Sequence, residues 1–446
     1  MRSSSVARAL SRGACVTVAA GLATVGLAGP AVADSDQLWL TTPYEVTLPV
    51  ATEGGEAPAQ TLKLGLSHDN TNYTVTDGHI TVDVSGLAGV AEVTWPEGCA
   101  PSGATAVCSV PEVPVSGTFA GVRLDVRAVP GAAVGATGRI GYTARATTTA
   151  PGGELTAFAQ ETTVTLASGP DLVLRATAPS GDVQPGATVA VPFTVVNRGN
   201  EPSRGVRVSM YVTRGLDVGA VAPQCTTTPL GGEDGYIPVS KVECAFGDVL
   251  APGASFALPE PLRATVAPYA FHERVDLGVE PGDGATDLSP SDNGESVGVR
   301  AVNTADFQVK GAEVTGAAGE TVTAALTFRN KGPAWVANLG SGEPVGVLDF
   351  VVPRGATVVE VPENCSGRTL DGDWYEEPTG APRYQCRLPL WVGEKQTVTF
   401  PLKLRVDTVV PDATGTLRLL PGWGEARPVD PDTRNNEAKV VLNPAG

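Results

Sequence analysis

The feature that most limits the fold of this chain is an alternation of apolar with polar or small side chains at every second residue. It is clearest in 206–213 (VRVSMYVT) and 397–406 (TVTFPLKLRV). Successive side chains of a β-strand point to opposite faces, so this period predicts strands with one buried face. Between such segments, the 53 glycines and 37 prolines mark frequent turns. We therefore predict an all-β chain whose sheets pack face to face as β-sandwiches.

Two segments far apart in the chain have matching sequences. PGATVAVPFTVVNRG at 185–199 and AGETVTAALTFRNKG at 318–332 share Gly, Thr, Val, Thr, Asn and Gly at the same offsets. Each repeat closes with a polar turn and a last strand, at 287–299 and 430–442. Internal repeats in a chain too long for one core predict tandem domains. After residues 1–33, their predicted boundaries are 34–168 (more divergent in sequence), 169–303 and 304–446.

Residues 1–33 have the layout of a secretory signal peptide. Arg2, Arg8 and Arg12 form a positive start, an apolar stretch follows, and Ala31-Val32-Ala33 predicts cleavage before Asp34. The alternative is a membrane anchor, but glycines and Pro30 leave a short apolar run for spanning a bilayer. The sequence therefore predicts a secreted protein, free or held at the cell surface without a covalent anchor.

The net charge argues against two classes of partner. Removing three arginines and no acidic residue with the signal peptide takes the formal net charge from −17 to −20. A surface this acidic repels phosphate backbones and anionic lipids. We expect no nucleic-acid binding, no membrane insertion after cleavage, and no cofactor; the expected partner is an extracellular protein or a glycan.

Six cysteines remain after cleavage, because Cys15 leaves with the signal peptide. Two of them fall in each predicted domain, and an exported chain forms disulfides in an oxidising compartment. A proline just before the first cysteine of each pair predicts a strand end, so each bridge should tie a strand end to a neighbouring strand. The predicted pairs are Cys99–Cys108, Cys225–Cys244 and Cys365–Cys386.

The repeated unit PG-x-T-V-x-V-x-F-T-V-x-N-x-G, a cysteine-bearing loop and a closing turn like D-x-x-x-x-N-N form a recognisable combination. It resembles bacterial extracellular immunoglobulin-like repeats of the cell-adhesion-related (CARDB-type) group, which also occur in large surface proteins of Gram-positive bacteria. The resemblance covers 170–446 well and 34–168 loosely. It implies three tandem immunoglobulin-like β-sandwiches, no catalytic residues, and a binding or spacer role outside the cell.

Few residues in the chain suggest catalysis or metal binding. His68-Asp69 and His79 are expected to be surface turn residues, because no nucleophile motif accompanies them. His272-Glu273 lacks the second histidine of a zinc-protease helix. Clustered carboxylates suit calcium, which makes Asp283, Asp287 and Asp292 weak candidates, although Asp also stabilises turns without a metal. We expect no enzymatic activity.

The segment between Cys365 and Cys386 is rich in aromatic side chains. Adjacent exposed aromatics often mark a recognition surface, so a ligand-binding surface is predicted at Trp374, Tyr375, Tyr384, Asp373 and Glu376. The alternative is a loop folded onto its own sandwich. Trp391 is expected in the core, whereas Trp335 and Trp423 are left unassigned.

The sequence thus predicts an exported non-enzymatic protein for extracellular binding, adhesion or envelope structure. A second hypothesis is a secreted carbohydrate-binding or inhibitor protein that uses the aromatic loop of the third domain. An enzyme with an unrecognised site is a third, because convergent sites escape motif reading.

Overall fold

Nearly all regular structure in the chain is β-strand, which confirms the predicted all-β class. The computed structural model describes residues 35–52, 55–115, 118–232, 235–258, 260–422 and 430–443. The predicted signal peptide and Trp423 lie outside these residues. No helix in these ranges is long and apolar enough to cross a membrane.

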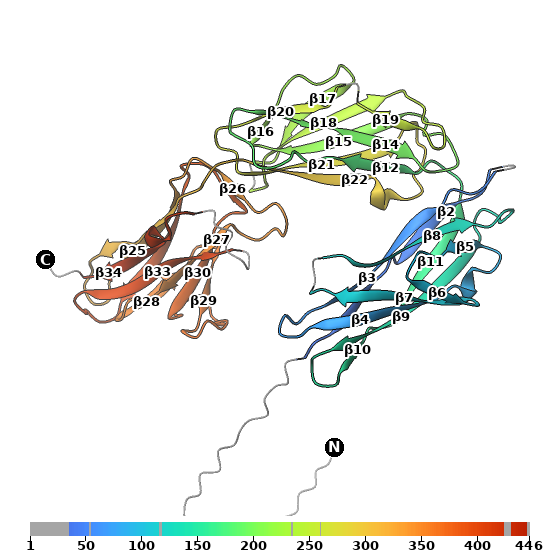
Figure 1. Ribbon diagram of the computed structural model, residues 1–446. Helices are drawn as coiled ribbons and strands as arrows, with labels where there is room; N and C mark the ends of the chain where they lie inside the picture. The colour runs from blue at the N-terminus through green and yellow to red at the C-terminus, as the bar shows by residue number, and fades with distance from the viewer. Residues whose placement is uncertain are drawn as a thin grey trace, which may run out of the picture.

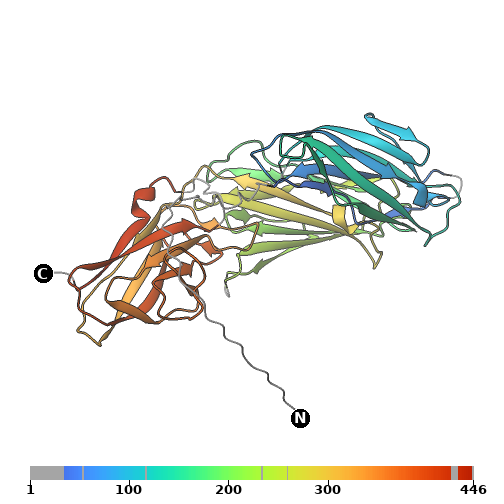
Figure 2. The same ribbon diagram turned by 90° about the horizontal axis from the view of Figure 1, so that it is seen from below.

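The strands form three groups in chain order, 38–167, 172–300 and 307–442, which we call the first, second and third strand groups. Among the described strands, none pairs with a strand of another group. In Figure 1 the second group forms the top of an arch, and the first and third groups lie at its two sides. Figure 2, seen from below, shows the three groups following one another in a row.

The first strand group contains two sheets, and its strands are antiparallel apart from the parallel pair β2 and β11. One sheet has the order β1 (Leu38–Thr41), β3 (Gln60–His68), β8 (Ala120–Ala128), β5 (Ala91–Thr94). The other has the order β2 (Glu45–Pro49), β11 (Gln160–Ala167), β9 (Thr137–Thr148), β4 (Val75–Asp83), β7 (Thr105–Val113), β6 (Cys99–Ser102), with β10 (Glu154–Thr156) on β9 and the 3-10 helix η1 (Ser85–Leu87) after β4.

Apart from β10, the third strand group repeats this topology, including the parallel pair β24 and β34. Its sheets have the orders β23 (Phe307–Lys310), β25 (Thr321–Asn330), β32 (Thr397–Val406), β28 (Ala356–Glu360), and β24 (Glu313–Val314), β34 (Glu437–Leu442), β33 (Ala413–Pro421), β27 (Gly346–Val351), β30 (Arg383–Arg387), β29 (Cys365–Arg368). The short pair β26 (Val336–Ala337) and β31 (Trp391–Val392) and the 3-10 helix η3 (Thr433–Asn435) complete it. The first group therefore shares a topology with the third in spite of its divergent sequence.

In the second strand group one of the two layers is divided. Pro192 lies between two short strands where the other groups have one long strand, and proline has no N–H for the ladder. The divided layer contains β12 (Leu172–Ala176), β14 (Phe193–Asn197), β19 (Ser255–Ala257), and β13 (Thr188–Val191), β20 (Leu262–Val266), β16 (Leu216–Val218). The intact layer has the order β17 (Cys225–Leu230), β18 (Val239–Phe246), β15 (Val206–Thr213), β21 (His272–Pro281), β22 (Gly294–Arg300), with the 3-10 helix η2 (Pro290–Asp292) before β22.

Each strand group encloses its own apolar core, built from the inward faces of both layers. In the first group, Leu64 and Leu124 from one sheet pack with Ile80 and Ile140 from the other, and all four are buried. These residues sit at alternate positions of their strands, so the two-residue alternation is what makes one face of each sheet apolar. The architecture is that of sandwiched sheets, as predicted. Phe271 of the second group packs in the core of the third.

The three predicted disulfides are present, and each joins two directly opposed residues of neighbouring strands. The Cα atoms are 3.9 Å, 4.0 Å and 3.9 Å apart in Cys99–Cys108, Cys225–Cys244 and Cys365–Cys386. Before the first and third pairs, a proline carbonyl accepts the cysteine N–H, from Cys99 to Pro96 and from Cys365 to Pro362. This turn carries the chain from one sheet to the other, from β5 to β6 and from β28 to β29. The disulfide fixes the chain just after that crossing.

Candidate functional site

The loop between Cys365 and Cys386 is held in one shape by its own hydrogen bonds. The N–H of Thr369 donates to the Asp373 carbonyl (2.9 Å), and the N–H of Gly372 donates back to the Thr369 carbonyl (3.1 Å). Arg383 donates to the carbonyl of Leu370 (3.2 Å). With the disulfide closing its base, this loop has little conformational freedom to lose on binding.

Trp374 lies at the tip of this loop and is 66% exposed. The guanidinium carbon of Arg368 lies 4.8 Å from the centre of its indole ring, and Arg368 is itself held by a 3.0 Å hydrogen bond to Gln385. The neighbouring Asp373 and Glu376 are exposed. The structure thus presents a fixed indole between carboxylates, as the sequence predicts.

The other two predicted aromatic contacts are not at the surface. Tyr384 is fully buried, its hydroxyl oxygen accepts the N–H of Ala381 (3.0 Å), and its burial raises its pKa. Its assignment to a ligand surface is wrong, because Tyr384 shares the inward face of β30 with Cys386. Tyr375 is half-buried and packs against the core of the third group, which fits the alternative of a loop folded onto its own sandwich. Of the three aromatics, Trp374 alone is exposed.

A second concentration of aromatic side chains lies where the second strand group meets the third, a region we call the second joint. Trp335 is only 1% exposed, and its indole N–H donates to the Glu273 carboxylate of the second group (2.6 Å). Trp391 is half-exposed and donates to the Tyr236 carbonyl in the inter-cysteine segment of the second group (3.0 Å). The prediction of Trp391 as a core residue is therefore wrong. Its place is in the joint, with its ring 6.4 Å from that of Trp335.

Glu273 is the buried acceptor that organises this joint. Its carboxylate takes hydrogen bonds from four donors: Thr213 Oγ1 at 2.6 Å, the N–H of Gly215 at 3.0 Å, the N–H of Phe271 at 3.0 Å and the Trp335 indole at 2.6 Å. A buried carboxylate is stable only when its oxygens are satisfied in this way. Nothing in the sequence indicates this role, because Thr213, Gly215 and Trp335 are distant from Glu273 in the chain and the His272-Glu273 dipeptide suggests only a zinc motif.

Arg214 lies among three aromatic rings of the second joint. Its guanidinium carbon is 4.4 Å from the ring centre of Tyr269, 5.6 Å from Trp335 and 5.8 Å from Trp391. It also pairs with Glu394 of the third group at 3.2 Å. Cation–π contacts and an ion pair therefore converge on one side chain that spans the joint.

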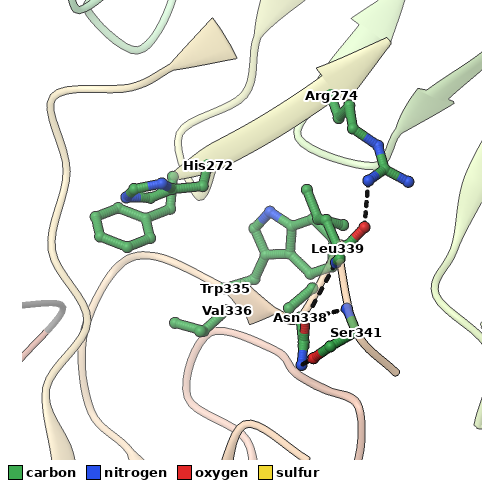
Figure 3. A pocket seen from close by; sticks show the side chains of 10 residues that line it. His272, Arg274, Trp335, Val336, Asn338, Leu339 and Ser341 are labelled. Carbon is green, nitrogen blue, oxygen red and sulfur yellow. Dashed lines mark hydrogen bonds between the residues drawn. The ribbon is translucent and has the colours of Figure 1, made fainter. Parts of the chain in front are cut away.

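A pocket of about 390 Å³ adjoins Trp335, between β21 of the second group and residues 336–341 of the third. Figure 3 shows the indole at its centre, with His272 and Arg274 on the strand above it. Arg274 is already engaged, because it donates to the Leu339 carbonyl and pairs with Asp276 at 2.8 Å. The pocket offers a mostly apolar wall to a small side chain or ligand group.

The prediction of His68 as a surface turn residue is wrong. His68 is buried, and its Nδ1 lies 3.0 Å from the Asp36 carboxylate. Asp36 also accepts the N–H of Asn70 (3.1 Å), so the pair ties the start of the described chain to the turn after β3. Asp69 is a separate anchor that accepts the N–H of Gln37 (3.0 Å). These contacts account for both residues structurally.

The three calcium candidates are not gathered into one site. Asp283 is exposed, whereas the carboxylate of Asp287 accepts the N–H groups of Leu172 (2.8 Å) and Ser289 (2.9 Å) and so stabilises a turn. Across the described ranges, no three His, Cys, Asp or Glu residues are placed so that they could hold a metal ion.

Comparisons with known proteins do not assign a family. No family model matches the sequence, and no curated protein matches it. One similar solved structure is that of Dpr2 Ig1-Ig2 in complex with DIP-Theta Ig1-Ig3, at 10% identity over 92% of this chain and 100% of that chain, with a TM-score of 0.24. Another is the C-terminal domain of the Streptococcus pyogenes antigen I/II-family protein AspA, at 11% identity over 61% of this chain and 99% of that chain, with a TM-score of 0.18. Superpositions with such low scores support no inference about function.

Proposed function

We propose that this chain is an exported, non-enzymatic protein that uses tandem immunoglobulin-like domains for extracellular binding, adhesion or cell-envelope structure. In this proposal the domains are 34–168, 169–303 and 304–446, and residues 1–33 are a cleaved signal peptide. Separate cores in the three strand groups support the division. Three disulfides support a place outside the cell.

The observation that carries the binding role is Trp374. Trp374 is a large aromatic side chain that is 66% exposed on a disulfide-closed, internally hydrogen-bonded loop, and it lies outside the apolar core of the third group. Aromatic anchors of this kind give much contact area for few rotatable bonds. The surrounding Asp373 and Glu376 can accept hydrogen bonds from sugar hydroxyls or meet a basic protein surface.

A more specific alternative, a secreted carbohydrate-binding or inhibitor protein, rests on the same loop. The two versions differ in where the ligand resides. An adhesion or envelope component is retained by the producing cell's own surface, whereas a soluble effector stays in the medium.

The test compares retention of the mature protein and its Trp374→Ala variant on envelope material and on a glycan array. Tyr44→Ala is the matched control, because Tyr44 is an aromatic side chain 83% exposed in the first strand group. Truncating an aromatic anchor weakens binding about tenfold or more. We expect that loss for Trp374→Ala and none for Tyr44→Ala, with unchanged melting temperatures. Equal retention of both variants and the parent would remove the loop from the proposal.

A further inference from the structure

The second and third strand groups close with a similar turn, which has an aspartate (Asp287 or Asp430) and an asparagine (Asn293 or Asn436) at equivalent positions. In each, an aspartate carboxylate accepts the N–H two residues later: Ser289 to Asp287 at 2.9 Å, and Asp432 to Asp430 at 3.0 Å. A 3-10 turn follows in each, η2 or η3, and the last strand begins at the same offset. The chain therefore contains two versions of one structure that can be compared directly.

An aspartate at the start of each group faces this turn. Asp171 and Asp306 precede the first strands, β12 and β23, and occupy equivalent places. The backbone carbonyl of each accepts an N–H at 2.6 Å, from Arg198 and from Lys331 respectively.

One of the sequence differences between the two turns falls at the position that faces the starting aspartate. In the third group Asn435 donates its side-chain N–H to the Asp306 carboxylate (2.9 Å). In the second group the equivalent residue is Asp292. A carboxylate has no proton to donate, so the bond made in the third group cannot form in the second group while both aspartates are ionised.

Without a donor at position 292, the buried carboxylate of Asp171 has an unfavourable environment. Asp171 is only 1% exposed, and its Oδ2 accepts the side-chain N–H of Gln60 from the first strand group (3.0 Å). Its Oδ1 and the Oδ1 of Asp292 are buried, and neither has a hydrogen-bond partner in the described chain. Burying unpaired carboxylate oxygens near like charges is strongly unfavourable.

We propose that Asp171 and Asp292 share one proton in the folded protein, so that a carboxyl–carboxylate hydrogen bond takes the place of the Asn435–Asp306 bond. The proton lowers the charge of the cluster and gives each unpaired oxygen a partner. Because Asp171 also holds Gln60, this proton-binding site lies at the junction of the first and second strand groups, which we call the first joint.

The charges and burial around the two aspartates favour the bound proton. Burial, and then the charges of Asp292 and Asp287, raise the pKa of Asp171 to about 7, against weaker opposing effects of the hydrogen bond from Gln60 and the charge of Arg198. Burial and Asp287 raise the pKa of Asp292 to about 6, opposed by Arg175 and Arg198. Burial also raises the pKa of Asp287.

These shifts fix the sign of the pH dependence. An aspartate in the unfolded chain titrates near pH 4, so between about pH 4 and 7 the folded state binds more protons than the unfolded state. Stability must then fall as pH rises through that window. The second strand group is therefore most stable in mildly acid conditions and less stable near neutral pH.

The experiment measures melting temperatures of the full mature chain at pH 5.5 and pH 8, for the parent, Asp292→Asn and Asn435→Asp. We expect the transition that involves the second strand group to melt about 3–6 °C lower at pH 8 than at pH 5.5 in the parent. Asp292→Asn, which copies the third group, should lose most of this difference. Asn435→Asp should introduce a smaller pH difference in the melting of the third group, because Asp306 forms an ion pair with Lys331 at 3.4 Å. A pH difference unchanged by Asp292→Asn would overturn the proposal.

Two further measurements use the unmutated parent. One detects the shared proton directly, and the other tests whether a cation occupies the cluster instead. Carboxyl ¹³C NMR of the parent should show a shared titration with an apparent midpoint between about pH 6 and 7; midpoints near 4 for both aspartates would contradict it. Calcium or magnesium chloride added at pH 8 should not raise the melting temperature. Stabilisation by either salt in the parent, and not in Asp292→Asn, would show that a cation occupies the cluster instead.

Discussion

The two joints of this molecule are held by different kinds of contact. At the second joint, Trp335 is buried against Glu273 and Arg214 lies among three aromatic rings. At the first joint, two amide side chains donate hydrogen bonds from one strand group to the other. Gln60 donates to the Asp171 carboxylate and Asn200 donates to the Val50 carbonyl, both at 3.0 Å. The second joint therefore combines apolar burial with satisfied charge, whereas the hydrogen bonds across the first joint join uncharged amide groups to a carboxylate and a backbone carbonyl.

A short sequence difference accounts for much of this contrast. The second and third groups have a matching turn in the repeat, at Asn197-Arg198-Gly199 and at Asn330-Lys331-Gly332. Five residues after the asparagine, the second group has Pro202 and the third group has Trp335. One large side chain at this offset reaches back to the preceding group. We therefore expect the orientation between the second and third groups to vary less than the orientation between the first and second.

The largest effect should come from Trp335→Ala. Truncating a buried tryptophan costs about 3–5 kcal/mol, and here it also leaves Glu273 without one of its donors. We expect a lower melting temperature and a wider range of angles between the second and third groups, measured by calorimetry and small-angle scattering. Trp335→Phe is the control, because it keeps most of the packing and loses the hydrogen bond. Scattering curves that do not change in Trp335→Ala would mean that this contact does not hold the joint.

A smaller effect is expected for Arg214→Lys. Lysine keeps the positive charge opposite Glu394 but cannot stack its planar group on the aromatic rings. Cation–π contacts with partly buried rings contribute about 1–2 kcal/mol, so the free energy of unfolding should fall by about that amount in denaturant titrations. Arg214→Ala should cost more. If Lys and Ala are equally tolerated, the aromatic stacking does not stabilise the joint.

The sequence predicted the strands, the disulfides and the exposed Trp374, because these depend on local patterns. It could also have placed Tyr384 inside, since Tyr384 and Cys386 are two residues apart in a strand and share one face. The role of Glu273 as a buried acceptor could not be predicted from local patterns, because its donor Trp335 is 62 residues away. His68 was misjudged for the same reason, since its partner Asp36 lies 32 residues before it.

The contrast between the joints is tested most directly by distance distributions between paired spin labels at different pH. Labels at Val134→Cys and Tyr211→Cys span the first joint, and labels at Tyr211→Cys and Val409→Cys span the second; all three side chains are exposed. The account predicts a narrow distribution across the second joint that is the same at pH 5.5 and pH 8. Across the first joint it predicts a broader distribution at both pH values. Equal widths across both joints, or a second joint broader than the first, would contradict it.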